Sequence, residues 1–144
     1  MDQIDAMILR ALVQDARASY TAMAERAALS ANAVAERIRR MQRDGTIRGF
    51  SVDVAPEALG QRIFAFIDLR FAPGVSSQAF ESDIAKHPRV LAFMFTTGRS
   101  DCTLRVAVGD QDELHSLIEE LRGFGALDTY TRIIVREETF PLII

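Results

Sequence analysis

The stretch from Leu29 to Phe50 constrains the fold most, because it has the pattern of a helix with two different faces. Ser30 is a good N-cap residue, since its hydroxyl can accept a hydrogen bond from a free amide of the first turn, and Gly45 is a common stop. Apolar residues recur at helical spacing, which predicts a stripe that docks on a core: Val34, Ile38 and Met41. The opposite face is polar and largely basic, with Asn32, Glu36, Arg39 and Arg43 at its centre and Ala33 and Arg40 on its shoulder.

Two shorter helices are predicted before this one. Residues 2–13 place apolar side chains on one side and Asp2 and Asp5 at the start, where a helix favours negative charge. Residues 20–27, opened by Ser19, bury Met23 in a second helix that is separated from the third by a very short connection. A short helix followed closely by a basic one predicts a helix-turn-helix, in which the second helix enters the major groove of DNA.

The basic helix is followed by a pattern that favours a strand. Asp44 and Gly45 form a turn signal, and residues 46–54 are rich in β-branched and aromatic side chains. We therefore expect a wing-like ribbon after the helix-turn-helix.

The second half of the chain predicts a different architecture. A Pro and a Gly within residues 55–60 indicate a hinge. Strands are expected at residues 63–71, 90–97, 102–108 and 127–135, with helices at 76–86 and after Asp110. This β-α-β-β-α-β order predicts a ferredoxin-like sandwich, with two helices on one face of a four-stranded antiparallel sheet, and an α+β fold class for the whole chain.

The other face of the sheet is also partly apolar. The first strand carries Phe64 and Phe66 on that face, and the second strand is apolar on both faces. A sheet of this kind needs a second layer, and another copy of the same sheet can supply it. We expect a homo-oligomer, which is a dimer or an assembly of dimers up to an octamer.

Three motifs resemble one known family: the D-x-x-I-L opening, the R-I-R-R-M-x-x-x-G-x-I-R-G-F run, and the T-G-x-x-D turn from Thr97 to Asp101. With the element order, they make the chain similar to the Lrp/AsnC (feast/famine) transcription regulators over essentially its whole length. The resemblance implies a winged helix-turn-helix DNA-binding domain at residues 1–54, a hinge at 55–61, and a RAM-type effector-binding and oligomerisation domain at 62–144. It also implies that a small effector, usually an amino acid, modulates assembly or DNA binding.

Within the DNA-binding domain, side chains at the start of the basic helix are placed to read base edges, and those farther along suit phosphates. The predicted base readers are Ser30, Asn32, Ala33 and Glu36, and the predicted phosphate contacts are Arg39, Arg40 and Arg43. Arg37 lies close to the apolar stripe, so it is either a DNA contact or an internal salt-bridge residue.

The turn from Thr97 to Asp101 has two interpretations. In the first, the turn is a plain β-hairpin, in which Gly98 supplies a positive φ and the Asp101 carboxylate accepts hydrogen bonds from nearby amides. The family resemblance implies an effector site instead, where free amides take an α-carboxylate and Asp101 faces the α-amino group. The expected contacts are Thr97, Gly98, Arg99, Ser100 and Asp101, with Thr129 and Thr131 as further contributors. An aromatic residue is common in the family where this chain has Ser100.

Composition supports a soluble, cytoplasmic protein, and although its overall charge argues mildly against nucleic acid, the distribution of that charge suits duplex DNA as a partner. The net charge of −3 is unevenly distributed, with eight Arg against seven Asp and Glu in residues 1–55, and five Arg between Glu36 and Arg48. A local basic patch on an acidic chain suits a DNA reader that works as an oligomer. No apolar run reaches the length of a membrane span, and Cys102 alone can form neither an internal disulfide nor a cysteine-rich zinc site.

Catalysis has no visible apparatus in the sequence. No G-x-S-x-G motif, glycine-rich phosphate loop or Cys-His arrangement is present, and neither His87 nor His115 has metal-ligand spacing around it. We expect no catalytic residues, no metal and no cofactor. The rival interpretations are a small-molecule enzyme of dimeric ferredoxin-like type with an accessory helical domain, and an adaptor whose winged helix contacts protein.

Overall fold

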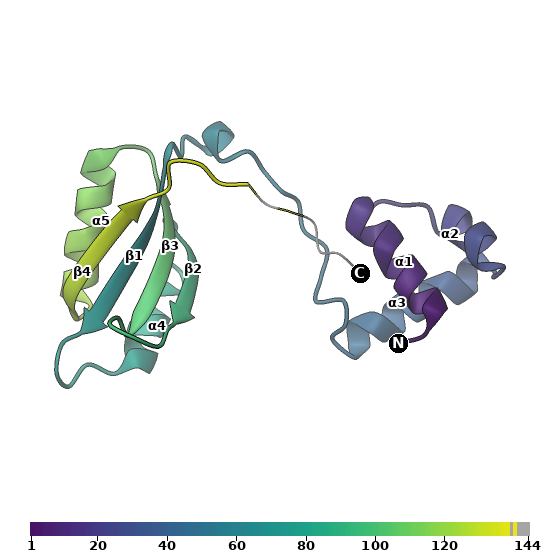
Figure 1. Cartoon of the computed structure of the whole chain (residues 1–144), viewed down its shortest axis with the longest axis horizontal. Helices are drawn as coiled ribbons and strands as arrows, with labels where there is room; N and C mark the ends of the chain where they lie inside the picture. Colours follow the sequence, from purple (N-terminus) through teal and green to yellow (C-terminus); the bar gives the residue numbers. More distant parts are fainter. Residues whose placement is uncertain (139, 141–144) are drawn as a thin grey trace. The chain divides into compact units, whose positions relative to one another are not determined.

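The computed structural model describes residues 1–138 and 140, and within it the chain divides into two compact units. The first contains Met1–Asp53 and the second Val54–Glu137 (Figure 1). Each unit has a hydrophobic core of its own.

The first unit consists of three helices, as predicted: α1 (Gln3–Gln14), α2 (Tyr20–Ala27) and α3 (Ala31–Arg43). Their apolar stripes meet in one core, formed by Ile8, Leu9, Leu12, Met23, Ala24, Val34, Ile38 and Met41. The Ser30 hydroxyl oxygen accepts a hydrogen bond from the Ala33 amide at 3.1 Å, which confirms the predicted cap of α3. The turn between α2 and α3 passes through Ala28, which adopts the left-handed conformation with φ of 52°.

The predicted strand and wing over residues 46–54 are wrong. Each of these residues is described, and the structure gives them a turn followed by extended chain without strand pairing. Extended backbone becomes a strand only when a neighbouring chain accepts its amides, and three helices offer no such neighbour. Ile47 packs on the helical core and its amide donates to the Met41 carbonyl, whereas Phe50, Val52 and Val54 are exposed.

The second unit has the predicted ferredoxin-like architecture. A 3-10 turn, η1 (Pro56–Leu59), precedes the elements β1 (Ile63–Phe71), α4 (Ser77–Ile84), β2 (Val90–Phe95), β3 (Cys102–Val108), α5 (Gln111–Gly123) and β4 (Ala126–Ile133). The strands form one antiparallel sheet in the order β2-β3-β1-β4 (Figure 1). Both helices cover the same face, because Phe80 of α4 and Leu117 of α5 share a core with inward residues of the sheet such as Ile67 and Leu104.

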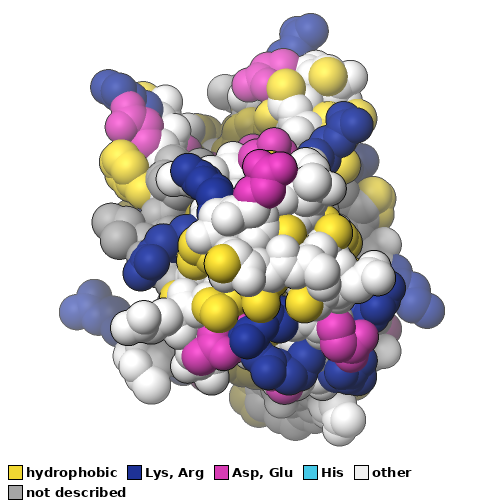
Figure 2. Space-filling model, turned by 90° about the vertical axis from the view of Figure 1, so that its right-hand side faces the viewer, with side chains coloured by type: hydrophobic (Ala, Val, Ile, Leu, Met, Phe, Trp, Pro, Cys, Tyr) yellow, Lys and Arg dark blue, Asp and Glu magenta, His cyan; other side chains and the backbone are white. Residues whose placement is uncertain are grey.

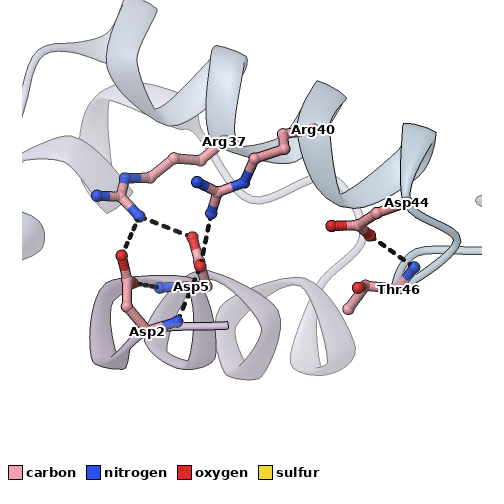
Figure 3. A network of polar contacts seen from close by, with 6 residues as sticks. All are labelled: Asp2, Asp5, Arg37, Arg40, Asp44 and Thr46. Atoms are coloured by element: carbon pink, nitrogen blue, oxygen red, sulfur yellow. Dashed lines mark hydrogen bonds and ion pairs between the residues drawn. The ribbon is translucent and has the colours of Figure 1, made fainter.

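Within the first unit, α3 is held against α1 by a cluster of charges that we call the Asp5 clamp: Asp2, Asp5, Arg37 and Arg40 (Figure 3). Asp2 and Asp5 form a capping box at the start of α1, in which each carboxylate accepts from the other residue's amide, at 2.8 and 3.0 Å. The Asp5 carboxylate, whose side chain is 1% exposed, also accepts from Arg37 at 2.8 Å and from Arg40 at 2.6 Å. The clamp therefore ties the first turn of α1 to the middle of α3.

These contacts lower the pKa values of both carboxyl groups. The Asp5 amide, and then Arg37, hold the pKa of Asp2 at about 2. Burial would raise the pKa of Asp5, but the Asp2 amide, Arg37 and the charge of Arg40 outweigh burial, so this pKa is also lowered. Both carboxylates therefore stabilise the fold while they are ionised.

We predict that Asp5→Asn lowers the free energy of unfolding of the helical unit by about 2 kcal/mol, because a buried charged acceptor is lost and an amide N–H₂ group faces a donor. Asp15→Asn is the matched control, since this exposed carboxylate accepts only a local amide among the contacts described, from Arg17. Urea denaturation followed by helical circular dichroism measures both variants. A similar midpoint for Asp5→Asn and wild type would contradict the role of the clamp.

The Asp5→Asn variant also tests how the stability of the helical unit depends on pH. The contribution of a carboxyl group with a lowered pKa is present above its unfolded pKa of 3.8 and is lost as the pH falls through the folded pKa. Wild type should therefore lose stability between about pH 4 and pH 2, and Asp5→Asn should lose less over this interval.

Candidate nucleic-acid interface

The outward face of α3 is the candidate DNA-binding surface. Its apolar stripe of Val34, Ile38 and Met41 is at most 2% exposed, which fixes the orientation of the helix. The polar side chains on the opposite side are accessible: Asn32, Glu36, Arg39 and Arg43. The two-faced helix predicted from the sequence is thus confirmed, and its four arginines form two groups that differ in their ion-pair partners.

The first group consists of Arg37 and Arg40, which point toward α1 and take part in the Asp5 clamp (Figure 3). The Arg37 side chain is 24% exposed and its guanidinium contacts both Asp2 and Asp5, so it is the internal salt-bridge residue of the two alternatives. Arg40 is half-exposed, but one nitrogen already binds Asp5 at 2.6 Å. The Arg40 guanidinium therefore helps to hold α3 in place, and the phosphate that Arg40 is predicted to contact would compete with Asp5 for it.

The second group consists of Arg39 and Arg43, which are 64% exposed and pair only with Glu36 among the contacts described. All three side chains extend from the same helix face into solvent. Figure 2 shows Lys and Arg side chains gathered low on the face in view, with Asp and Glu side chains beside them.

The predicted base readers lie at the start of the same helix. Asn32 is exposed and Ala33 is half-buried. Ser30 is exposed as well, and its oxygen accepts a hydrogen bond from the Ala33 amide as the cap, so the hydroxyl keeps its donor hydrogen and one lone pair for another partner.

The sequence did not reveal the partners of Arg37 and Arg40. Asp2 and Asp5 are explained locally by the start of a helix, and their contacts to α3 cross more than 30 residues of chain. The available signal was the position of Arg37 beside the apolar stripe, with Arg40 one turn farther on the same side.

The turn from Thr97 to Asp101 lies beyond the ends of β2 and β3, with its side chains exposed except for half-buried Ser100. Gly98 has a φ of 118°, a backbone angle that residues with a side chain rarely adopt. The Asp101 carboxylate accepts a hydrogen bond from the Phe71 amide at 2.8 Å, and the Asp101 amide donates to the Leu69 carbonyl at 2.9 Å. Asp101 thus fastens the turn to the end of β1, through a strand 30 residues earlier in the chain and not through an amide of the turn itself.

Thr129 and Thr131 are not brought to this turn within one chain. They pair with Leu69 and Ile67 and therefore belong to the side of the sheet that the helices cover. The strand β1 separates β4 from β3 and its turn. Cys102, next to the turn, is fully buried, and burial raises the pKa of its thiol to about 12, which confirms a small core residue.

The open face of the sheet combines charges with apolar side chains. Asp68 accepts hydrogen bonds from the Thr103 hydroxyl at 2.6 Å and from Arg132 at 3.1 Å, and the Arg132 guanidinium lies 5.5 Å from the centre of the Phe66 ring. Arg105 binds Glu137, yet its Nε atom is buried without a hydrogen-bond partner in this structure.

Met94 and Tyr130 share the open face, because they pair across the sheet with Thr103 and Asp68, and both are exposed.

Within residues 1–138 and 140, no group of three or more His, Cys, Asp or Glu side chains is placed to hold a metal ion. Over the same residues, every helix is too short or too polar to cross a membrane.

Comparison with known proteins identifies both units. A model of the AsnC-type helix-turn-helix domain matches residues 1–42, and a model of the Lrp/AsnC ligand binding domain matches residues 64–140. The leucine-responsive regulatory protein of Klebsiella pneumoniae is 32% identical, over 95% of this chain and 86% of the relative. The HTH-type transcriptional regulator FL11 of Pyrococcus furiosus is 30% identical, over 99% of this chain and 95% of the relative.

Solved structures agree with this assignment. The leucine response regulatory protein LrpA of Mycobacterium tuberculosis superposes with a TM-score of 0.84 at 26% identity, covering 97% of this chain and 96% of that one. A transcriptional regulator of Neisseria meningitidis, solved in complex with L-methionine, shares the fold with a TM-score of 0.88 at 23% identity, covering 98% and 94%. The chain therefore belongs to the Lrp/AsnC family of transcription regulators, in which a DNA-binding helix-turn-helix is joined to a ligand-binding domain.

Proposed function

We propose that this regulator recognises specific duplex DNA sequences by placing the outward face of α3 in the major groove. The observation that carries the proposal is the division of the α3 arginines, since the Asp5 clamp fixes the helix while Arg39 and Arg43 remain exposed on its other side. Asn32 near the start of α3 suits a paired contact with adenine, and exposed arginines suit phosphates. Ser30, Ala33 and Glu36 complete the proposed base-reading set.

We predict that the double variant Arg39→Gln/Arg43→Gln binds all duplexes more weakly and lowers the slope of log affinity against log salt by about 1.8, at about 0.9 for each lost phosphate contact. The matched control is Arg17→Gln/Arg26→Gln, which removes the same charge from exposed positions of the same unit. Fluorescence anisotropy over a salt series measures both slopes. Equal reductions in the two double variants would remove Arg39 and Arg43 from the proposed interface.

The proposed division of labour follows the two compact units. Residues 1–54 bind DNA, residues 55–61 form a hinge, and residues 62–144 bind effector and assemble. The hinge contains the short η1 turn, which is capped by Gly60, and the φ of 75° at this position favours glycine. As a regulator of genomic DNA, the protein is proposed to act in the cytoplasm.

Assembly through the open sheet face is part of the same proposal. This face presents Met94 and Tyr130 to solvent, and the Arg105 Nε atom on it lacks a partner in the described single chain. A second copy related by two-fold symmetry would cover the apolar groups and bring both signs of charge to the interface. We therefore propose a homodimer as the minimal unit, with assemblies of dimers up to an octamer.

An amino acid is the proposed effector class. The ligand-binding domain of this chain and the L-methionine complex of the Neisseria regulator support this class. In the turn from Thr97 to Asp101, exposed side chains and amides suit a carboxylate. Because one Asp101 oxygen holds the Phe71 amide, the second oxygen is the one proposed to face an α-amino group. Thr129 and Thr131 remain proposed contributors only if another copy supplies them.

We predict that Asp101→Asn abolishes the response to amino acids while keeping the turn, because Asn retains an oxygen for the Phe71 amide but carries no charge for an ammonium group. Melting temperature and sedimentation of the full chain, with and without each of the twenty amino acids, measure the response. Wild type should sediment as a dimer or larger and change size or stability with at least one amino acid.

Two results would count against these assignments. Equal ligand responses in wild type and Asp101→Asn would leave Asp101 as a turn residue only. A monomeric wild type at micromolar concentration would contradict assembly through the sheet.

A further inference from the structure

Glu36 lies at the centre of the exposed face of α3, and each of its carboxylate oxygens contacts a different arginine. Oε2 is 3.3 Å from Arg39 Nη1, and Oε1 is 3.1 Å from Arg43 Nη2. The Glu36 side chain is 60% exposed, so these contacts lie in solvent on the surface proposed to meet DNA.

We propose that Glu36 is a specificity-determining residue that competes with DNA phosphates for Arg39 and Arg43. This inference rests on the proposed function, since it requires that the outward face of α3 binds DNA. It goes beyond a base-reading role, because it assigns Glu36 an effect on every sequence, including those in which no base contacts it.

The competition follows from the chemistry of the groups. A carboxylate offers a guanidinium two acceptor oxygens, as a phosphate does, so both anions occupy the same donors. Exposed ion pairs are weak, so the closely spaced phosphates of a duplex can displace Glu36. Once displaced, the Glu36 carboxylate is left beside the DNA backbone, where like charge makes its position unfavourable.

The acids of the Asp5 clamp differ from Glu36 in this respect. Asp5 is buried and belongs to α1, and it holds Arg37 and Arg40 from the side of the helix that faces the core. Phosphates approaching the outward face meet Glu36 first. Hydrogen bonds from Arg43 and then Arg39 lower the pKa of the Glu36 carboxyl, so it is ionised at neutral pH.

Sequence dependence arises from what the base edges offer the displaced carboxylate. Cytosine presents an N4 amino donor in the major groove, and an acidic side chain is a suitable acceptor for it. A site with that donor opposite Glu36 compensates for the lost arginine contacts, whereas other sequences do not. Glu36 therefore weakens binding to random DNA more than binding to a matching site.

The test compares Glu36→Gln and Glu36→Ala with wild type in the full-length chain. The probes are a random-sequence 30-base-pair duplex and the tightest duplex that wild type selects from a random pool. Glu25→Gln is the matched control, because Glu25 is an exposed residue of α2 and its replacement changes the charge of the same unit equally. Melting temperatures verify that each variant is folded.

We expect both Glu36 variants to bind the random duplex about threefold to tenfold tighter than wild type, with a smaller gain for Glu25→Gln. The ratio of selected to random affinity should fall, because the selected duplex gains less, and selection repeated with Glu36→Ala should lose a cytosine preference.

Two outcomes would overturn the inference: gains no larger than that of Glu25→Gln, or equal gains on the two duplexes. Failure of wild type to bind either duplex would instead overturn the proposed function itself.

Discussion

The helical unit depends on one interaction, the contact of buried Asp5 with Arg37 and Arg40. A short three-helix unit has a small core, so the angle at which α3 crosses α1 is set by few contacts. The clamp adds directional hydrogen bonds to the apolar stripe and uses both oxygens of one carboxylate to connect the two helices (Figure 3). As a result, two of the four arginines in α3 serve the fold and two stay exposed.

This division explains how an acidic chain can present a DNA-binding surface. The net charge of −3 gives no general attraction to DNA, and the exposed arginines of α3 are partly compensated by Glu36. Binding then depends on placing several weak contacts at once, which an assembly of two or more copies favours. In this account, the partly apolar open face of the sheet serves DNA recognition indirectly, because it brings the helical units together in pairs.

Local patterns predicted most of the fold. Helices α1 to α3 follow from apolar spacing, from the negative charge of Asp2 and Asp5 at the start of α1 and from the cap at Ser30, and the strands of the second unit follow from alternation between Pro and Gly signals. The prediction of a strand over residues 46–54 was wrong, because strand formation needs a pairing partner and the local sequence does not indicate whether one is present. The role of Arg40 and the separation of Thr129 from the turn were not predictable either, since they depend on contacts and register between distant segments.

The most direct test of this account is the nuclear magnetic resonance of the arginine side-chain Nε–H groups while duplex DNA is added to the full-length protein. Because the arginines of α3 are divided into a clamp pair and an exposed pair, the signals of Arg39 and Arg43 should shift when DNA is added at low salt and return to their DNA-free positions as salt is raised. The signals of Arg37 and Arg40 should stay where they are, because the Asp5 clamp is retained in the complex. Shifts of Arg37 and Arg40 that match or exceed those of Arg39 and Arg43 would contradict the account.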